Sequence, residues 1–380
     1  MKLPVHPDPF VLFRQDLHRF PELSGQETQT QQRIRDFVGL LNPAAILPIG
    51  GTGLLVQYGT DDPGPVTLIR ADIDALPIQE VNTIAYRSQD AGVSHLCGHD
   101  GHTAILVRLA ASLNATPLAK GRVYLLFQPA EETGKGAEAV LHDPAFTDIQ
   151  PNRVFALHNL PGFPEGTILS KPGPFTASVQ SMIVSFTGRV SHAAEPEQGR
   201  NPAYVMSAFI TQTHTLQQPD IQYDTFSLIT PVYTTMGEKS YGVSAGYGEV
   251  NLTLRTKSSQ RMDELIEQLH SLLDQLTADS GIGVETRYTD AFVANENDPA
   301  AFAQVRQCAQ TLNFPFQEVS EPLRWGEDFG LFTQRFPGAM FGIGAGEDSP
   351  ALHHNHYDFN DRLIEPAARM FRALIDLDHA

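Results

Sequence analysis

Residues 66–74 read VTLIRADID, and this stretch decides the fold class. It is an apolar run that ends in acids, which is typical of a strand buried on both faces of a sheet. Residues 123–129, VYLLFQP, and 153–160, RVFALHNL, repeat this arrangement, and a helix-like segment at 102–113 separates the first two strands. Strands that alternate with helices predict an α/β fold with a mixed, largely parallel sheet flanked by helices. The carboxyl ends of such strands are where these sheets place active sites.

The middle of the chain has a different pattern. Several segments alternate between apolar and polar residues, as half-buried antiparallel strands do, and two others carry apolar stripes of helical period. The expected strands are 175–190, 250–256 and 284–288, and the expected helices are 201–216 and 260–278. We therefore predict a small α+β sandwich over residues 175–288, inserted into a larger unit formed by residues 1–174 and 289–380.

Length and charge narrow the class of protein. A chain of 380 residues is long enough for about two domains. Its 26 Lys and Arg against 44 Asp and Glu give a net charge of −18, so the surface repels nucleic acids and anionic membranes. No apolar stretch reaches the roughly 18 residues that span a bilayer, and residues 1–20 lack the pattern of a secretory signal. With only Cys97 and Cys308 the chain has no disulfide framework, so we expect a soluble cytoplasmic protein.

The densest group of chemically active side chains lies at 95–102, which reads HLCGHDGH. Cys97 and His99 are two positions apart, so a thiolate and an imidazole can reach one metal across the turn that opens the helix. No second pair of this kind completes a tetrahedral structural zinc site, and an open catalytic metal site is therefore favoured. Cys308, in contrast, falls on an apolar helix face and is expected in the core.

Other candidate ligands follow other strands. Residues 128–132, QPAEE, place two adjacent acids after a buried strand. One carboxylate can bind a metal while its neighbour takes a proton from a water that the metal activates. His158 ends another strand, and residues 353–358, HHNHYD, add three histidines near the C-terminus. Asp72 and Asp74 could orient the ligand imidazoles.

The order of these motifs resembles that of the M20 family of metallopeptidases, specifically the amidohydrolase branch that includes hippurate hydrolases and indole-acetyl-amino-acid hydrolases. The resemblance covers nearly the whole chain and rests on the segments LHRFPELSGQE at 17–27, RADIDALPIQE at 70–80, HLCGHDGHTA at 95–104, FQPAEETGKGA at 127–137, ALHNLPGFPEGTI at 156–168, SHAAEPEQGRNPA at 191–203, WGEDFG at 325–330 and LHHNHYDFND at 352–361. It implies a zinc-exopeptidase-like catalytic domain and an inserted domain that acts as a lid and pairs two copies into a homodimer.

The resemblance also implies a role for individual residues. Five side chains match positions that hold two divalent metal ions, which could be Zn, Mn, Ni or Co: Cys97, His99, Glu132, His158 and His353. Glu131 matches the general base, and Asp74 matches the acid that supports the metal ligands from behind. His192 matches a histidine of the lid that helps to polarise the scissile carbonyl.

The sequence departs from the family pattern in three places. Asp72 stands where the H-x-D element of other M20 enzymes has a histidine, as the amidohydrolase branch requires. Near the C-terminus the usual His, variable residue, Pro is replaced, so that His354 or His356 could serve as a ligand in place of His353. After SHAA, relatives have Pro-His where this chain has Pro-Glu at 196–197, which changes the lid side of the pocket.

The predicted function is hydrolysis of the amide bond of N-acyl or aminoacyl amino acids, with small molecules rather than macromolecules as substrates. A dipeptidase or carboxypeptidase of the same fold is the alternative, and a metal-binding protein without catalysis is a third hypothesis. Cys97 favours the deacylating branch over the peptidases, and the presence of Glu131 beside all five ligands argues against an inactive protein.

Overall fold

The computed structural model describes residues 8–60 and 63–380, and within them the chain divides into two compact units. The first contains the described residues up to Phe175 together with Asn295–Ser320 and Asp328–Ala380, and the second contains Thr176–Ala294 and Glu321–Glu327. The return to the first unit comes later than residue 289 because strand β13 continues past 288, to Phe292. Residues 1–7, part of the segment without a secretory-signal pattern, lie outside the described residues.

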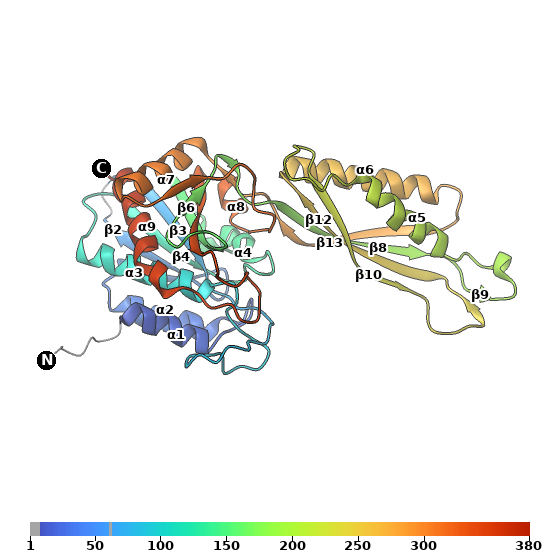
Figure 1. The fold of residues 1–380 in the computed structure, drawn as a ribbon, viewed down its shortest axis with the longest axis horizontal. Helices are drawn as coiled ribbons and strands as arrows, with labels where there is room; N and C mark the ends of the chain where they lie inside the picture. The colour runs from blue at the N-terminus through green and yellow to red at the C-terminus, as the bar shows by residue number, and fades with distance from the viewer. Residues whose placement is uncertain (1–7, 61–62) are drawn as a thin grey trace. The chain divides into compact units, whose positions relative to one another are not determined.

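An eight-stranded sheet forms the centre of the first unit (Figure 1). In spatial order its strands are β1 (Ala45–Ile49), β2 (Gly53–Gly59), β4 (Arg122–Gln128), β3 (Val66–Asp72), β5 (Arg153–Pro161), β16 (Gly338–Gly346), β6 (Ile168–Ser170) and β15 (Phe316–Glu318). The strands β4, β3, β5 and β16 run parallel to one another, as do β6 and β15, whereas the remaining neighbours are antiparallel. The prediction of a mixed, largely parallel sheet is confirmed.

Helices flank this sheet. They are α1 (Pro9–Arg19), α2 (Thr28–Gly39), α3 (His99–Ala115), α4 (Gly136–His142), α7 (Pro299–Thr311), α8 (Gly330–Thr333) and α9 (Ile364–Asp378). In one group, α3 and α9 pack on each other and on β3, while α1 and α2 pack against α3, and α7 packs against α9. In the other group, α4 and α8 pack on each other; α4 also contacts β4, and α8 contacts β16. Asp8 and Asp298 cap α1 and α7, each followed by a proline in the first turn, so these starts are specified locally.

Alternate side chains of the central strands enter two apolar layers. In β4, Val123, Leu125 and Phe127 join the core formed with α3 and α9. Tyr124 and Leu126 between them are equally buried but lie outside that cluster, as expected for side chains of the opposite face. Burial on both faces explains why these strands read as continuous apolar runs. Cys308 lies in the core on α7, as predicted.

The second unit is a four-stranded antiparallel sheet with two helices (Figure 1). Its strands are, in spatial order, β10 (Ser227–Met236), β12 (Tyr247–Thr256), β8 (Ser178–Thr187) and β13 (Gly283–Phe292), and its helices are α5 (Ala203–Thr213) and α6 (Ser259–Thr277). The buried stripe of α6, including Leu265 and Leu269, packs with Val184 and Leu252 of the sheet. The alternating pattern predicted β8, β12 and β13. Strand β10 was not predicted; it contains Pro231, where its pairing with β12 shifts register, and a proline within an apolar run argues against a strand.

No helix in the part of the chain that the structure describes is long and apolar enough to cross a membrane.

Candidate metal centre

The carboxyl ends of three neighbouring parallel strands meet at one edge of the large sheet. Asp72 ends β3, the segment after β4 carries Glu131 and Glu132, and His158 lies near the end of β5. This convergence follows from the strand order β4-β3-β5, since parallel neighbours end on the same side.

The first turn of α3 brings the cysteine and histidine of the HLCGHDGH motif to the same edge. Gly98 between them has a φ of 100°, and a Cβ at this position would lie 2.5 Å from Oδ1 of Asn159. Only glycine fits here, because other residues are strained at this φ and would collide with Asn159. The glycine thus allows Cys97 and His99 to face the cluster together.

Five predicted ligands lie close enough to share metal ions. Sγ of Cys97 is 3.5 Å from Nε2 of His158. Oε1 of Glu132 lies 3.8 Å from Nε2 of His99 and 3.7 Å from Nε2 of His353. Ligands that each bind a metal at about 2.0–2.3 Å are separated by roughly 3–4 Å, so these distances suit ions held between the groups. The ligand atoms form overlapping sets in which Cys97 belongs with His99 and His158, and also with Glu132 and His353.

Two ligand atoms support this interpretation because they are buried without a hydrogen bond. Among the described residues, Nε2 of His99 and Oε1 of Glu132 have no hydrogen-bond partner. A buried polar atom left unsatisfied is costly, and a cation would satisfy both atoms. The donor set of thiolate, imidazole and carboxylate fits Zn, Mn, Ni or Co.

The electrostatics of the cluster also favour a cation. Burial raises the pKa of the Cys97 thiol well above its usual value, and the Glu132 carboxylate adds to the effect. Burial raises the pKa of Glu132 to about 7. Burial lowers the pKa of His158 well below its usual range, so this imidazole is neutral, as a ligand must be. A divalent ion would stabilise the ionised forms of Cys97 and Glu132.

Asp74 bonds to two of the predicted ligands, His99 and Glu132. Its Oδ1 is 3.2 Å from Nδ1 of His99, which also lies 3.0 Å from the Asp74 carbonyl. Its Oδ2 accepts hydrogen bonds from the backbone N–H of Glu132 and from the hydroxyl of Ser24. Although burial opposes it, the hydrogen bond to His99 holds the pKa of Asp74 below its usual range. The arrangement directs Nε2 of His99 into the cluster.

Asp72 bonds to His102 and lies close to the predicted ligand His99. Its Oδ1 is 2.6 Å from Nδ1 of His102, whereas its closest approach to His99 is 3.8 Å. The fully buried Arg70 donates to its Oδ2 at 2.7 Å. In turn Nε2 of His102 lies 2.6 Å from Oδ1 of Asn159. Asp72 therefore belongs to a buried polar network that adjoins the cluster through His99, and its role in orienting a ligand imidazole stays a prediction.

The structure distinguishes the three C-terminal histidines. His353 has a φ of 65° and donates its backbone N–H to the carbonyl of Leu96, directly before Cys97. Its ring belongs to the cluster, although its side chain is 49% exposed. His354 and His356 stack on each other, and neither belongs to a metal-binding group among the described residues. The geometry thus favours His353.

Glu131 lies beside the ligands, and His192 lies in the other unit. One carboxylate oxygen of Glu131 is within 4.8 Å of ligand atoms of His99 and Glu132, and the residue is 6% exposed. His192 ends the short strand β9 (Ser191–His192) of the second unit and is exposed. Its role stays a prediction from the resemblance.

A charged network behind α3 was not predicted. His18 of α1 lies with Nδ1 2.8 Å from Oδ2 of Asp100 and Nε2 3.3 Å from Oε1 of Glu80. Burial opposes the charge on His18, but Asp100 and Glu80 raise its pKa to about 9. The buried Arg14 contacts Asp100 and also Asp358 in the loop after His353.

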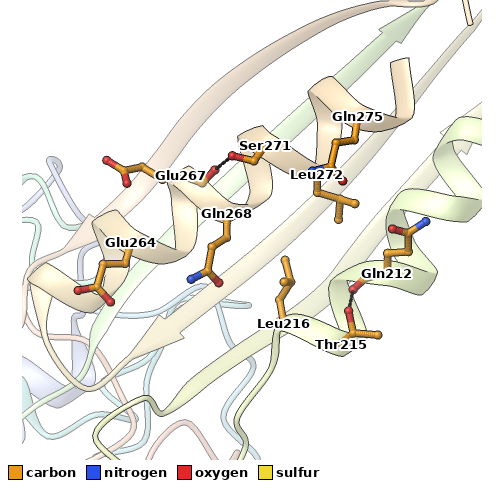
Figure 2. A pocket seen from close by; sticks show the side chains of 9 residues that line it. All are labelled: Gln212, Thr215, Leu216, Glu264, Glu267, Gln268, Ser271, Leu272 and Gln275. Atoms are coloured by element: carbon orange, nitrogen blue, oxygen red, sulfur yellow. Dashed lines mark hydrogen bonds between the residues drawn. The ribbon is translucent and has the colours of Figure 1, made fainter. Parts of the chain in front are cut away.

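A groove in the second unit offers no comparable site. It has a volume of about 560 Å³ and lies between α5 and α6, where Figure 2 shows mostly polar side chains. The lining residues are Gln212, Thr215, Leu216, Glu264, Glu267, Gln268, Ser271, Leu272 and Gln275. The hydroxyls of Ser271 and Thr215 bond to carbonyls of their own helical segments, and the lining includes neither histidine nor cysteine.

Sequence reasoning assigned no role to several residues that support the cluster. They are Arg14, His18, Ser24, Arg70, His102, Asn159 and Tyr357. Asn159 directly follows the predicted ligand His158 and His102 comes three residues after His99, and this closeness in the sequence is a signal that could have found them. Arg14 carries no local signal, because its acidic partners come from distant parts of the chain. Arg70 bonds to Asp72, two residues away, and also to the distant Asp328.

Comparisons with known proteins agree with this geometry. The sequence profile of peptidase family M20/M25/M40 matches residues 68–377. An N-acetylcysteine deacetylase of Bacillus subtilis (strain 168) is 29% identical over 96% of this chain and 95% of its own length. An N-acetyldiaminopimelate deacetylase of Listeria innocua serovar 6a is 31% identical over 91% of this chain and 92% of its own length.

A solved structure shares the fold. A Bacillus subtilis protein described as a dinuclear metal binding peptidase from the M20 family superposes with a TM-score of 0.83. It is 28% identical to this chain, and the match covers 98% of each chain.

Proposed function

The chain belongs to peptidase family M20/M25/M40, and on that premise we propose that it is a metal-dependent hydrolase that deacylates N-acyl amino acids. The observation that carries the proposal is the cluster of Cys97, His99, Glu132, His158 and His353 with Glu131 beside it. Two similar proteins are deacetylases of N-acetyl amino acids, so an acetyl group is the first acyl group to test.

We propose that the five ligands hold two divalent ions, in keeping with the dinuclear centre of the B. subtilis structure. When bound, such ions lower the pKa of a water and polarise the amide carbonyl. The unpartnered Nε2 of His99 and Oε1 of Glu132 are the atoms of this chain that most need them.

Three side chains of the protein, Glu131, Asp74 and His158, supply the other functions that hydrolysis needs. Glu131, buried beside His99 and Glu132, accepts the proton of the attacking water and returns it to the leaving amine. Asp74 keeps the ring of His99 in one orientation through Nδ1. His158 stays neutral through burial and offers Nε2 next to Cys97.

For the second unit we propose the roles that the resemblance implies, a lid that carries His192 and a surface that pairs two copies. We likewise propose a cytoplasmic location.

The test is a hydrolysis screen on protein of known metal content. N-acetylcysteine, N-acetyldiaminopimelate and N-benzoyl amino acids are compared with dipeptides in the presence of added Mn²⁺ or Zn²⁺. We expect release of free amino acid from acylated substrates, its loss after prolonged chelation, and its return when metal is added back. Preferential cleavage of dipeptides would favour the peptidase alternative, and full activity of metal-free protein would refute the mechanism.

A further inference from the structure

Glu27, in the N-terminal segment, is a completely buried carboxylate outside the metal cluster. It occupies the N-cap position of α2, yet its side chain makes no hydrogen bond to that helix. Residues at this position normally accept an N–H of their own helix. In this protein Glu22 does so instead, with its carboxylate accepting the N–H groups of Gln29 and Thr30.

The Glu27 carboxylate instead accepts hydrogen bonds from two segments outside α2. Its Oε1 accepts the backbone N–H of Ala130 at 2.8 Å, and its Oε2 accepts the hydroxyl of Thr52 at 2.5 Å. Thr52 lies in the turn between β1 and β2, so the bond connects three segments that are distant in the sequence. Burial raises the pKa of Glu27, and the hydrogen bonds from Thr52 and Ala130 counteract that rise.

Ala130 needs this support because its backbone is strained. It has a φ of 53°, in the left-handed region that residues with a Cβ rarely adopt. A strained conformation of this kind persists only where surrounding contacts hold it. On its other side, the carbonyl of Ala130 accepts the N–H groups of Lys135 and Gly136. A Cβ on Gly136 would lie 1.7 Å from the carbonyl oxygen of Pro129, so the turn leaves no room for a larger residue there.

Glu131 and Glu132 follow the strained residue directly, and its conformation sets the direction in which both carboxylates leave β4. The backbone N–H of Glu132 is fixed by Asp74 and the carbonyl of Glu131 accepts the N–H of Gly134, so the bond from Ala130 to Glu27 fixes the start of this short segment. A charged acceptor holds such an N–H more strongly than a neutral one.

We propose that Glu27 is a positioning residue, which locks the left-handed Ala130 through Thr52 and the buried hydrogen bond and so aims Glu131 and Glu132 at the metal centre. The inference deepens the proposed function and rests on it for the role of Glu131. Its structural basis is the contact set of Glu27, Thr52 and Ala130.

The experiment compares Glu27→Ala and Glu27→Gln with Glu22→Ala as a matched control. Glu22→Ala also removes a carboxylate that supports the start of α2, but one that bonds to the helix itself rather than to the segment before Glu131. For each protein we measure the affinity of the metal-free form for Zn²⁺ by competition with a chelating dye, kcat and KM on N-acetyl amino acids, and the midpoint of thermal unfolding.

We expect Glu27→Ala to lower Zn²⁺ affinity and kcat by about 10- to 100-fold each, the range for partners that orient metal-site residues, with little change in KM. Glu27→Gln keeps an acceptor oxygen and should recover part of both losses. Glu22→Ala should lower the unfolding midpoint while leaving Zn²⁺ affinity and kcat close to the wild type. If Glu27→Ala has the same Zn²⁺ affinity and the same kcat as Glu22→Ala, the proposal is overturned.

Two further comparisons keep the test decisive. If Glu27→Ala does not fold, Thr52→Val removes the hydroxyl donor alone and Thr52→Ser retains it; loss of Zn²⁺ affinity and kcat in the first with recovery in the second supports the proposal, and unchanged values in both overturn it. If the wild type cleaves no acylated substrate, the proposed function fails. The Zn²⁺ affinities still decide the positioning role, since they do not depend on turnover.

Discussion

Replacing each of the adjacent acids Glu131 and Glu132 by glutamine should affect metal content and catalytic rate differently. Both substitutions preserve shape and remove one negative charge. Oε1 of Glu132 is almost equidistant from two predicted ligand imidazoles, 3.8 Å from Nε2 of His99 and 3.7 Å from Nε2 of His353. Glu131 is within reach of the same cluster but has no part in the group of Cys97, Glu132 and His353. Glu132→Gln should therefore release metal, whereas Glu131→Gln should retain it.

The expected magnitudes follow from these positions. A general base contributes about 10²–10⁴-fold to the rate, or roughly 3–5 kcal/mol of activation free energy, so Glu131→Gln should lower kcat by that factor. Loss of an outer partner of a metal ligand costs about 10- to 100-fold in affinity, so loss of Glu132, which we propose as a direct ligand, should cost more than about 100-fold.

The assay combines elemental analysis of the desalted proteins with the rate of free amine release at saturating substrate. Full metal content with a low kcat in Glu131→Gln, and low metal content in Glu132→Gln, is the expected pair of results. Equal metal contents together with equal rates in the two variants would show that neither role has been placed correctly.

Two other predictions concern the cysteines and the network behind α3. Cys97→Ser should reduce both metal content and rate, whereas Cys308→Ser, in the core of α7, should change neither; identical behaviour of the two variants would remove Cys97 from the ligand set. His18 has a pKa raised from 6.5 to about 9 by Asp100 and Glu80, so its contribution of about 3 kcal/mol to stability is complete below about pH 6.5 and is lost as pH rises through 9. His18→Gln should flatten the dependence of the unfolding free energy on pH across this window, and a wild type whose stability is already flat there would contradict the assignment.

The sequence alone determined the fold class and named the candidate residues of the site. Apolar runs ending in polar residues identified β3, β4 and β5, because a strand buried on both faces is apolar at nearly every position. The motifs at 95–102 and 128–132 named the candidate ligands, since those side chains are close in sequence as well as in space. Strand β10 was missed because Pro231 interrupts its pattern, at the point where its pairing with β12 shifts register.

Only the tertiary structure decided how the ligands are supported and which neighbours take part. It brought His353 rather than His354 or His356 to Glu132, through a backbone bond to Leu96 that no local pattern encodes. It brought Asp72 against His102 and Arg70, and it placed Glu27 against Ala130. Hydrophobic periodicity is a property of neighbouring residues and can be read along the chain. Buried polar groups must instead find partners wherever folding brings them, and those partners are known only when the strands have taken their order in the sheet.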